Sequence, residues 1–204
     1  MVKIDLKKQL AGLYKPTAKA VTLVDVPAMN FIMVDGHGAP ESPLFQQAIQ
    51  ALYPIAYTIK FARKKADGTD YGVMPLEGFW WADDMSAFTS GKTGRDKWQW
   101  TLMIMQPDFI TRADFTAAQE IAAKKNDNPL IAKVRFEKFK ECAAAQIMHV
   151  GPFSAEGPNV QKIHDKIVEL GGKLSGKHHE VYLSDFRKVD PQKMKTVLRQ
   201  PYSV

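Results

Sequence analysis

The sequence contains one cysteine, Cys142, among its 204 residues, so it cannot form an intrachain disulfide. No apolar run approaches the ~20 residues that a membrane-spanning helix needs. The first residues, Met1 to Asp5, carry charges where a secretory signal would carry an apolar stretch. These absences favour a soluble, cytoplasmic protein, and 204 residues are enough to bury a full hydrophobic core.

Motifs for nucleotides and metals are also absent. The glycines Gly36, Gly38, Gly171 and Gly172 do not form a strand–GxGxxG–helix arrangement, and there is no P-loop, so no nucleotide cofactor is predicted. His178, His179 and Glu180 are metal-ligand types, but adjacent strand residues point to opposite faces and no second His or Cys pair stands at ligand spacing. No metal site is predicted. Cys142 has no His partner pattern, which favours a small buried hydrophobic residue over a nucleophile.

The positively charged residues are distributed along the whole chain. The net charge is +6, yet Lys and Arg residues run from Lys3 to Arg199 with only short clusters such as 63–65. No helix-turn-helix or zinc-finger spacing accompanies them. We therefore expect no nucleic-acid partner.

What the chain does contain is an internal repeat. Residues 31–52 and 146–167 align without a gap at a shift of 115, with six identities in 22 positions. The identical residues are Ile32, Met33, Gly36, Glu41, Pro43 and Gln46, which recur as Ile147, Met148, Gly151, Glu156, Pro158 and Gln161. When insertions after these 22 positions are allowed for, Glu77 aligns with Glu180. The repeat predicts one pseudo-twofold domain with halves at about 20–125 and 130–204, and a cleft between them where a ligand can bind.

The order of elements is predicted to be the same in each half: strand, helix, strand, strand, which makes the fold α+β. In the first half we expect strands at 21–26, 30–35, 72–82 and 97–106, and a helix at 43–65 that Pro54 kinks or restarts. Thr111 is expected to cap a further helix through Lys125. In the second half we expect strands at 132–140, 144–150, 177–184 and 193–199, and a helix at 158–170. Residues 5–14 are expected to form a polar lead-in.

The stretch from His178 to Ser184 is the sharpest candidate for a site. Strand alternation places Glu180 and Tyr182 on one face, about 7 Å apart, and His179 and Val181 on the other. A strand with one wet polar side would show the same pattern. The repeat favours a functional interpretation, because Glu77 occupies the corresponding position in the first half.

The four tryptophans of the chain gather near Glu77. They lie between Trp80 and Trp100, within 21 positions, with Phe79 beside them. Alternation lets only part of this set enter one core face, so we expect Trp81 or Trp98, together with Trp100, to line a cleft opening toward Glu180. The alternative is that all these rings are buried for packing alone.

Several ordered motifs resemble those of stand-alone GyrI-like small-molecule-binding proteins: DYGVMPLEGFWW, QPDFIT, MHVGPF, GKHHEVYLSD and TVLRQP. The resemblance implies a tandem strand-helix-strand-strand (SHS2-type) fold enclosing a hydrophobic cleft. The family is similar to the effector-binding domains of drug-sensing transcription regulators, where a glutamate matching Glu180 selects aromatic and often cationic ligands. Some members are hydrolases that open strained cyclopropane rings of DNA-alkylating natural products. Two positions depart from the family pattern, namely Cys142 in place of Gly and Phe153 in place of Tyr.

Three functions remain open at this point. In a detoxifying hydrolase, Glu180 and Tyr182 would be catalytic and the substrate-binding residues would be Glu77, Phe79, Trp81, Trp98, Trp100 and Phe153. In a binder without chemistry, the same side chains would sequester a hydrophobic aromatic molecule. In a protein-interaction modulator, as some relatives are described, the partner is unknown.

Overall fold

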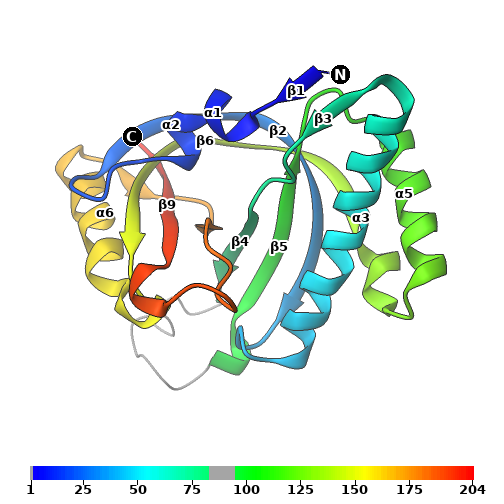
Figure 1. Cartoon of the computed structure of the whole chain (residues 1–204). Helices are drawn as coiled ribbons and strands as arrows, with labels where there is room; N and C mark the ends of the chain where they lie inside the picture. Colours follow the sequence, from blue (N-terminus) through cyan, green and yellow to red (C-terminus); the bar gives the residue numbers. More distant parts are fainter. Residues whose placement is uncertain (1, 83–94) are drawn as a thin grey trace.

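The computed structural model describes residues 2–82 and 95–204 (Figure 1). Six antiparallel strands form a ring in the order β6-β2-β5-β4-β8-β9, which an additional pairing of β9 with β6 closes. The strands are β2 (Thr22–His37), β4 (Leu76–Trp81), β5 (Gln99–Gln106), β6 (Arg135–Val150), β8 (His178–Tyr182) and β9 (Lys195–Ser203). The predicted α+β class is confirmed, although the closed, barrel-like sheet was not foreseen.

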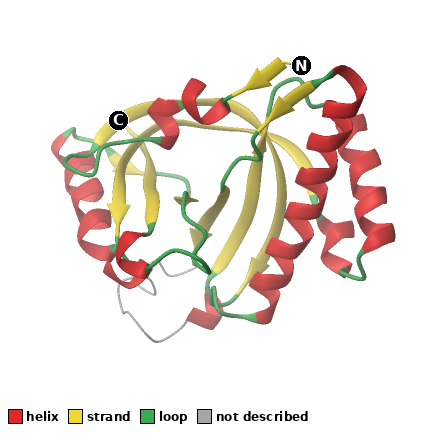
Figure 2. Ribbon diagram, in the orientation of Figure 1, coloured by secondary structure: helices red, strands yellow, loops and turns green. Residues whose placement is uncertain are grey.

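The helices lie outside the ring of strands. Figure 2 shows two of them together at one side and one at the other. They are α3 (Pro43–Asp67) with α5 (Arg112–Lys125), and α6 (Gly157–Glu169). The order β2-α3-β4-β5 followed by β6-α6-β8-β9 agrees with two units of the predicted kind. That the two units superpose remains a prediction.

Local sequence signals explain where the helices begin. At the start of α3, the Ser42 hydroxyl accepts a hydrogen bond from the Phe45 N–H. Gly68, with φ +75°, ends the helix. Pro54 lies inside α3 rather than ending it. Thr111 and Asp114 form a capping box at the start of α5, as the sequence predicts.

The long strands β2 and β6 replace four predicted strands, and both bend in the middle. Val26 pairs with Cys142 and Ala28 with Lys140, whereas Pro27, which has no N–H, makes no ladder pair. Cys142 has φ +67°, a left-handed conformation unusual for a side-chain-bearing residue. Its thiol is free and exposed, so the prediction of a buried Cys142 is wrong. A glycine would adopt this left-handed backbone without the steric cost of a Cβ.

The segment 5–14 is not a plain polar lead-in. It forms two short helices, α1 (Leu6–Gln9) and α2 (Ala11–Tyr14), that bury Leu6, Leu13 and Tyr14. Ahead of them, β1 (Val2–Ile4) pairs in parallel with β3 (Thr69–Tyr71). The smaller elements are β7 (Lys173–Leu174) and the 3-10 turns η1 (Arg95–Lys97), η2 (Pro129–Lys133), η3 (Phe153–Ala155) and η4 (Pro191–Lys193).

The core has two parts. The larger lies around α3, α5 and strands β2, β4 and β5, and the smaller lies beneath α6. The smaller part consists of Ala145, Ile147, Ile163, Ile167 and Leu198. Because Glu180 pairs with Leu198 across the β8–β9 ladder, Glu180 shares the sheet face that α6 covers. None of the described helices is long and apolar enough to cross a membrane.

Candidate functional site

One face of the β4–β8 pair carries both predicted catalytic residues. Gly78 pairs with Glu180 and Leu76 with Tyr182, and opposite residues of a ladder share a face. Trp80 lies on this face too, and its indole N–H donates a hydrogen bond to the Tyr182 hydroxyl at 2.8 Å. The proton of that hydroxyl is directed to Glu180, and this hydrogen bond is among the causes that raise the pKa of Tyr182. The expectation that Glu180 and Tyr182 point the same way holds.

Rings from α3 and from the η3 turn that precedes α6 reach this face. Phe45 of α3 stacks on Trp80, with ring centroids 5.6 Å apart. From the α6 side, the Phe153 ring meets the Tyr182 ring edge-on at 5.8 Å. In Figure 1, α3 and α6 stand at opposite sides of the molecule with the strands between them. Trp80 and Tyr182 therefore link ring contacts from α3 to a ring contact from η3.

A cavity of about 200 Å³ opens at Tyr182. It is lined by Lys7, Gln46, Ile49, Tyr53, Tyr57, Val73, Met74, Pro75, Leu76, Tyr182, Leu183, Ser184, Asp185, Phe186 and Arg187. A larger and more open cavity of about 860 Å³ lies along α3, between residues 126–129 and 185–188. We place the candidate site at the smaller cavity, because its lining includes Tyr182.

Tyr182, which lines the cavity, and the side chains of Glu180 and Glu156, which do not, influence one another electrostatically. Burial, and then the Glu180 carboxylate, raise the pKa of Tyr182 well above its ordinary value. Burial, and then the charge of Glu180, also raise the pKa of Glu156 to about 10. Burial and the charge of Glu180 therefore favour the neutral form of Glu156. His178 Nε2 lies 3.5 Å from the Glu180 carboxylate. Sequence reasoning assigned Glu156 no role.

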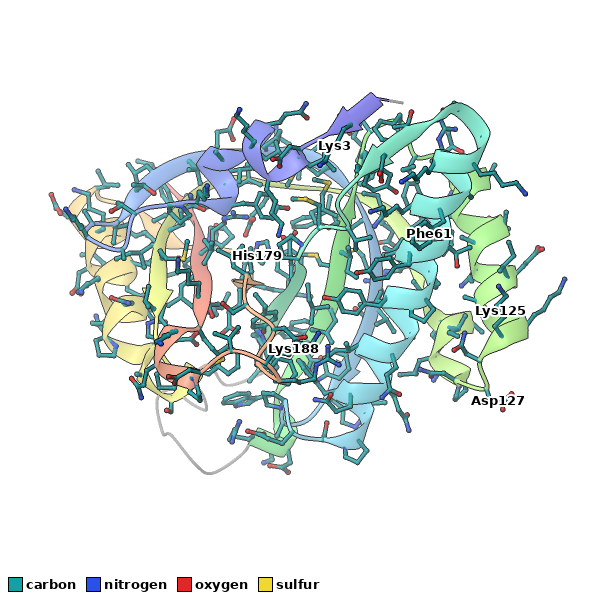
Figure 3. All side chains as sticks on the ribbon, viewed as in Figure 1. Lys3, Phe61, Lys125, Asp127, His179 and Lys188 are labelled. Carbon is teal, nitrogen blue, oxygen red and sulfur yellow. The ribbon has the colours of Figure 1, made fainter. Side chains whose placement is uncertain are left out.

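The opposite face of the same strands holds a different cluster. Glu77 pairs with Val181 and Phe79 with His179, so Glu77 points away from Glu180. His179 lies between two carboxylates, with Nε2 3.0 Å from Glu77 and Nδ1 3.0 Å from Glu141. Figure 3 shows His179 near the centre of the molecule. The structure thus does not bring Glu77 and Glu180 together in one cleft.

Arg199 completes this buried cluster and ties it to the N-terminal helices. Its Nη1 donates to Glu141 at 3.2 Å and its Nη2 donates to the Leu13 carbonyl at 2.8 Å. Tyr14 donates its hydroxyl hydrogen bond to Glu77 at 2.7 Å. Burial opposes the charged forms, yet Glu141 raises the pKa of His179 and, in return, His179 and then Arg199 lower that of Glu141. Two anions and two cations therefore balance inside the sheet.

The predicted aromatic residues do not form one wall. Trp100 has no exposed surface and packs edge-on against Phe45, so it belongs to the core. Phe79 contacts Phe139 and His179 on the inner face. Trp81 lies under the Lys177 ammonium, 3.2 Å from its ring centroid. Trp98 meets Trp80 edge-on at 5.9 Å, and the Arg95 guanidinium lies 5.1 Å from the centroid of the Trp98 ring. Of the predicted binding residues, Phe153 alone contacts Tyr182 among the ring pairs described.

Sequence reasoning missed Trp80, the tryptophan that contacts Tyr182. Strand alternation predicts that Leu76, Gly78 and Trp80 share one face of β4. Which tryptophan meets Tyr182 then depends on the register in which β4 pairs with β8. That pairing register is tertiary information. No described group of three or more His, Cys, Asp and Glu side chains is arranged to hold a metal ion.

Comparison with known proteins identifies the family. Residues 19–202 match the model of the GyrI-like small molecule binding domain, and the chain belongs to this family. No curated protein sequence matches the chain significantly.

Three solved structures illustrate what the chain is similar to. An uncharacterized conserved protein from Listeria innocua is 42% identical with a TM-score of 0.89, over 98% of this chain and 100% of that one. A protein described as a hydrolase from Listeria innocua is also 42% identical, with a TM-score of 0.85 and the same coverage. The EcmrR C-terminal domain, 15% identical with a TM-score of 0.54 over 90% of this chain and 96% of that one, shows the shared fold alone.

Proposed function

We propose that the cavity at Tyr182 binds hydrophobic aromatic small molecules, and that Glu180 and Tyr182 hydrolyse strained cyclopropane rings in such molecules. The observation that carries the proposal is the pairing of the half-buried Glu180 carboxylate with the Tyr182 phenol, whose hydroxyl also accepts a hydrogen bond from Trp80. The hydrolase description of the similar Listeria protein supports the reaction class. Detoxification of cyclopropane-containing DNA-alkylating compounds is the function proposed.

The proposed reaction needs a base and an oxyanion donor. Glu180 accepts a proton from water as the water oxygen forms a bond to a methylene carbon of the cyclopropane. The ring carbon–carbon bond breaks, and its electron pair moves into a conjugated carbonyl whose oxygen becomes negative. Once Glu180 is protonated, Tyr182 turns its hydrogen bond to that oxygen, while the Trp80 N–H holds the phenol in place. The proton on Glu180 then passes to the product anion, which restores the base. Aromatic contacts from Phe153 would orient the flat substrate.

The test is Glu180→Gln, which keeps the shape and removes the base. We expect turnover of a cyclopropane-containing alkylating compound, followed by product mass, to fall by about 10²-fold or more. Binding of the same neutral compound should survive, and stability should be equal or slightly higher, because a buried charge is removed. Full turnover by Glu180→Gln would contradict the assigned role.

Binding without chemistry is the alternative, with sequestration of a drug or toxin as the outcome. It is favoured if no member of a panel of cyclopropane compounds is turned over while Glu180→Gln selectively loses affinity for aromatic cations. The protein-interaction role remains a third possibility, whose partner no described feature identifies.

A further inference from the structure

Glu156 stands at the start of α6 but does not behave as a helix cap. It occupies the N-cap position of that helix and makes no side-chain capping hydrogen bond, whereas Ser42 and Thr111 cap α3 and α5. Its side chain is buried instead, with the residue 8% exposed. The carboxyl group therefore does not make the favourable interaction with the helix N-terminus that an N-cap side chain can make, and it is buried instead.

One oxygen of this carboxyl group is left unpartnered. Glu156 Oε1 is buried and has no hydrogen-bond partner among the described residues. A buried carboxylate oxygen without a partner is costly, whereas a neutral acid can carry a proton there. The hydroxyl of Thr196, which faces Tyr182 across the β8–β9 ladder, is the neighbour that favours the ionised form.

The charged and titratable groups around Glu156 come from three elements. Strand β8 contributes Glu180, Tyr182 and His178, of which Glu180 is the anion that acts on Glu156. Helix α6 contributes His164, whose pKa burial and then His178 lower. Strand β6 contributes His149, which is held by the Pro152 carbonyl and Asn159. Among the described contacts, no Lys or Arg is available to neutralise a second carboxylate. Glu156 and Glu180 together therefore carry one negative charge when no ligand is bound.

We propose that Glu156 carries the proton of a Glu156–Glu180 acid pair, and that it gives up this proton to solvent when an organic cation binds beside Glu180. The proposal rests on the function proposed above for the Tyr182 cavity. One O–H bond breaks and one positive charge replaces the proton, so the charge of the site is conserved. A neutral aromatic ligand displaces nothing and binds without proton release. Glu156 thereby lets one cleft accept both neutral and cationic molecules.

A first test needs no ligand. Carbon-13 NMR of protein labelled at the glutamate carboxyl carbons should show one carboxyl group that remains protonated at about pH 8, several units above the ordinary Glu value. That signal should be absent from Glu156→Gln. If the signal lost in Glu156→Gln titrates with the ordinary glutamates, the proposal is overturned.

A second test uses N-methylquinolinium and its neutral isostere 1-methylnaphthalene. Calorimetry at pH 8.5 in two buffers of different ionisation enthalpy should show release of up to one proton per bound cation, and none for the neutral compound. Above the range where imidazoles titrate, cation affinity should rise by up to about tenfold per pH unit. In Glu156→Gln the cation should bind without proton release and without this rise. A merely structural role for Glu156 would not produce that difference.

The matched control is Glu41→Gln, which alters the residue aligned with Glu156 in the first half. Glu41 is paired with Arg95 at 3.0 Å and its side chain is 70% exposed, so proton release should be unchanged. Equal release by Glu156→Gln and wild type would overturn the proposal. Binding of both compounds without any release would overturn it too, while leaving the proposed function standing. If neither compound binds, the proposed function and this inference fail together.

Discussion

At the scale of single residues, Gly36 leaves room for the ring of Trp100. A Cβ atom at Gly36 would lie 2.1 Å from that ring, which is fully buried and held by Phe45. We expect Gly36→Ala to lower the free energy of unfolding by about 3 kcal/mol, because the ring has nowhere to move. Urea unfolding measures the change.

Gly12→Ala is the matched control for this prediction. A Cβ at Gly12 would meet nothing within 4 Å, so stability should change by less than about 1 kcal/mol. Equal stability of Gly36→Ala and the wild type would show that the packing around Trp100 is looser than described.

Single residues also show how far the sequence could lead. Alternation alone placed Glu180 and Tyr182 together, since both belong to one short strand. It could not place Glu77, which lies on another strand, because a shift of one residue in the pairing exchanges the two faces. The ladder opposes Glu77 to Val181 rather than Glu180, and that register depends on the whole sheet.

At the scale of elements, the left-handed backbone of β6 at Cys142 leads to a testable prediction. Glu141 and Gln146 both contact Arg199, although residues five apart on a regular strand point to opposite faces. The strand therefore turns over between them, at Cys142 with φ +67°. We expect Cys142→Gly to stabilise the fold by about 1 kcal/mol, because left-handed backbone costs a side-chain-bearing residue about 1–2 kcal/mol. Thermal unfolding measures the gain.

Cys142→Ala separates backbone strain from the chemistry of the thiol. It removes the sulfur and keeps the Cβ, so no gain in stability is expected. A gain of the same size in both variants would attribute the effect to the sulfur instead.

The helices were the most predictable elements. α3, α5 and α6 begin within a residue of their predicted starts, because caps and helical apolar spacing are local signals. β2 and β6 were each predicted as two short strands, although each is continuous. The strands predicted at 72–82, 97–106 and 177–184 are longer than the observed β4, β5 and β8. The closure of the ring could not be predicted, because it depends on pairing between residues far apart in the chain.

At the scale of the whole molecule, a cluster links four strands to the N-terminal helices; its members are Glu77, Glu141, His179 and Arg199. The pKa of His179 is raised, so its contribution to stability is complete below about pH 6.5 and is lost as pH rises through the folded-state value. The pKa of Glu141 is lowered, so its contribution is complete above about pH 4.3 and is lost as pH falls. We expect the free energy of unfolding to be greatest between about pH 4.3 and 6.5.

Urea unfolding from pH 3 to 9 tests this profile, with His37→Gln as the control. His37 is exposed at the end of β2, so the alkaline decline in stability should persist in that variant. His179→Gln should lose about 3–5 kcal/mol at pH 5.5, because two buried carboxylates would lack their partner. A flat profile for the wild type from pH 6 to 9 would be inconsistent with a charged His179.

Closure of the sheet into a ring has a consequence for how quickly the chain can fold. β2 must pair with β6, although Val26 and its partner Cys142 are over a hundred positions apart. β9, which fills the last gap between β8 and β6, is also the last of the six strands to leave the ribosome. Until it arrives, the nascent chain presents open strand edges on both sides of that gap. Slow, contact-order-limited folding and a need for protection by chaperones are therefore expected of this architecture.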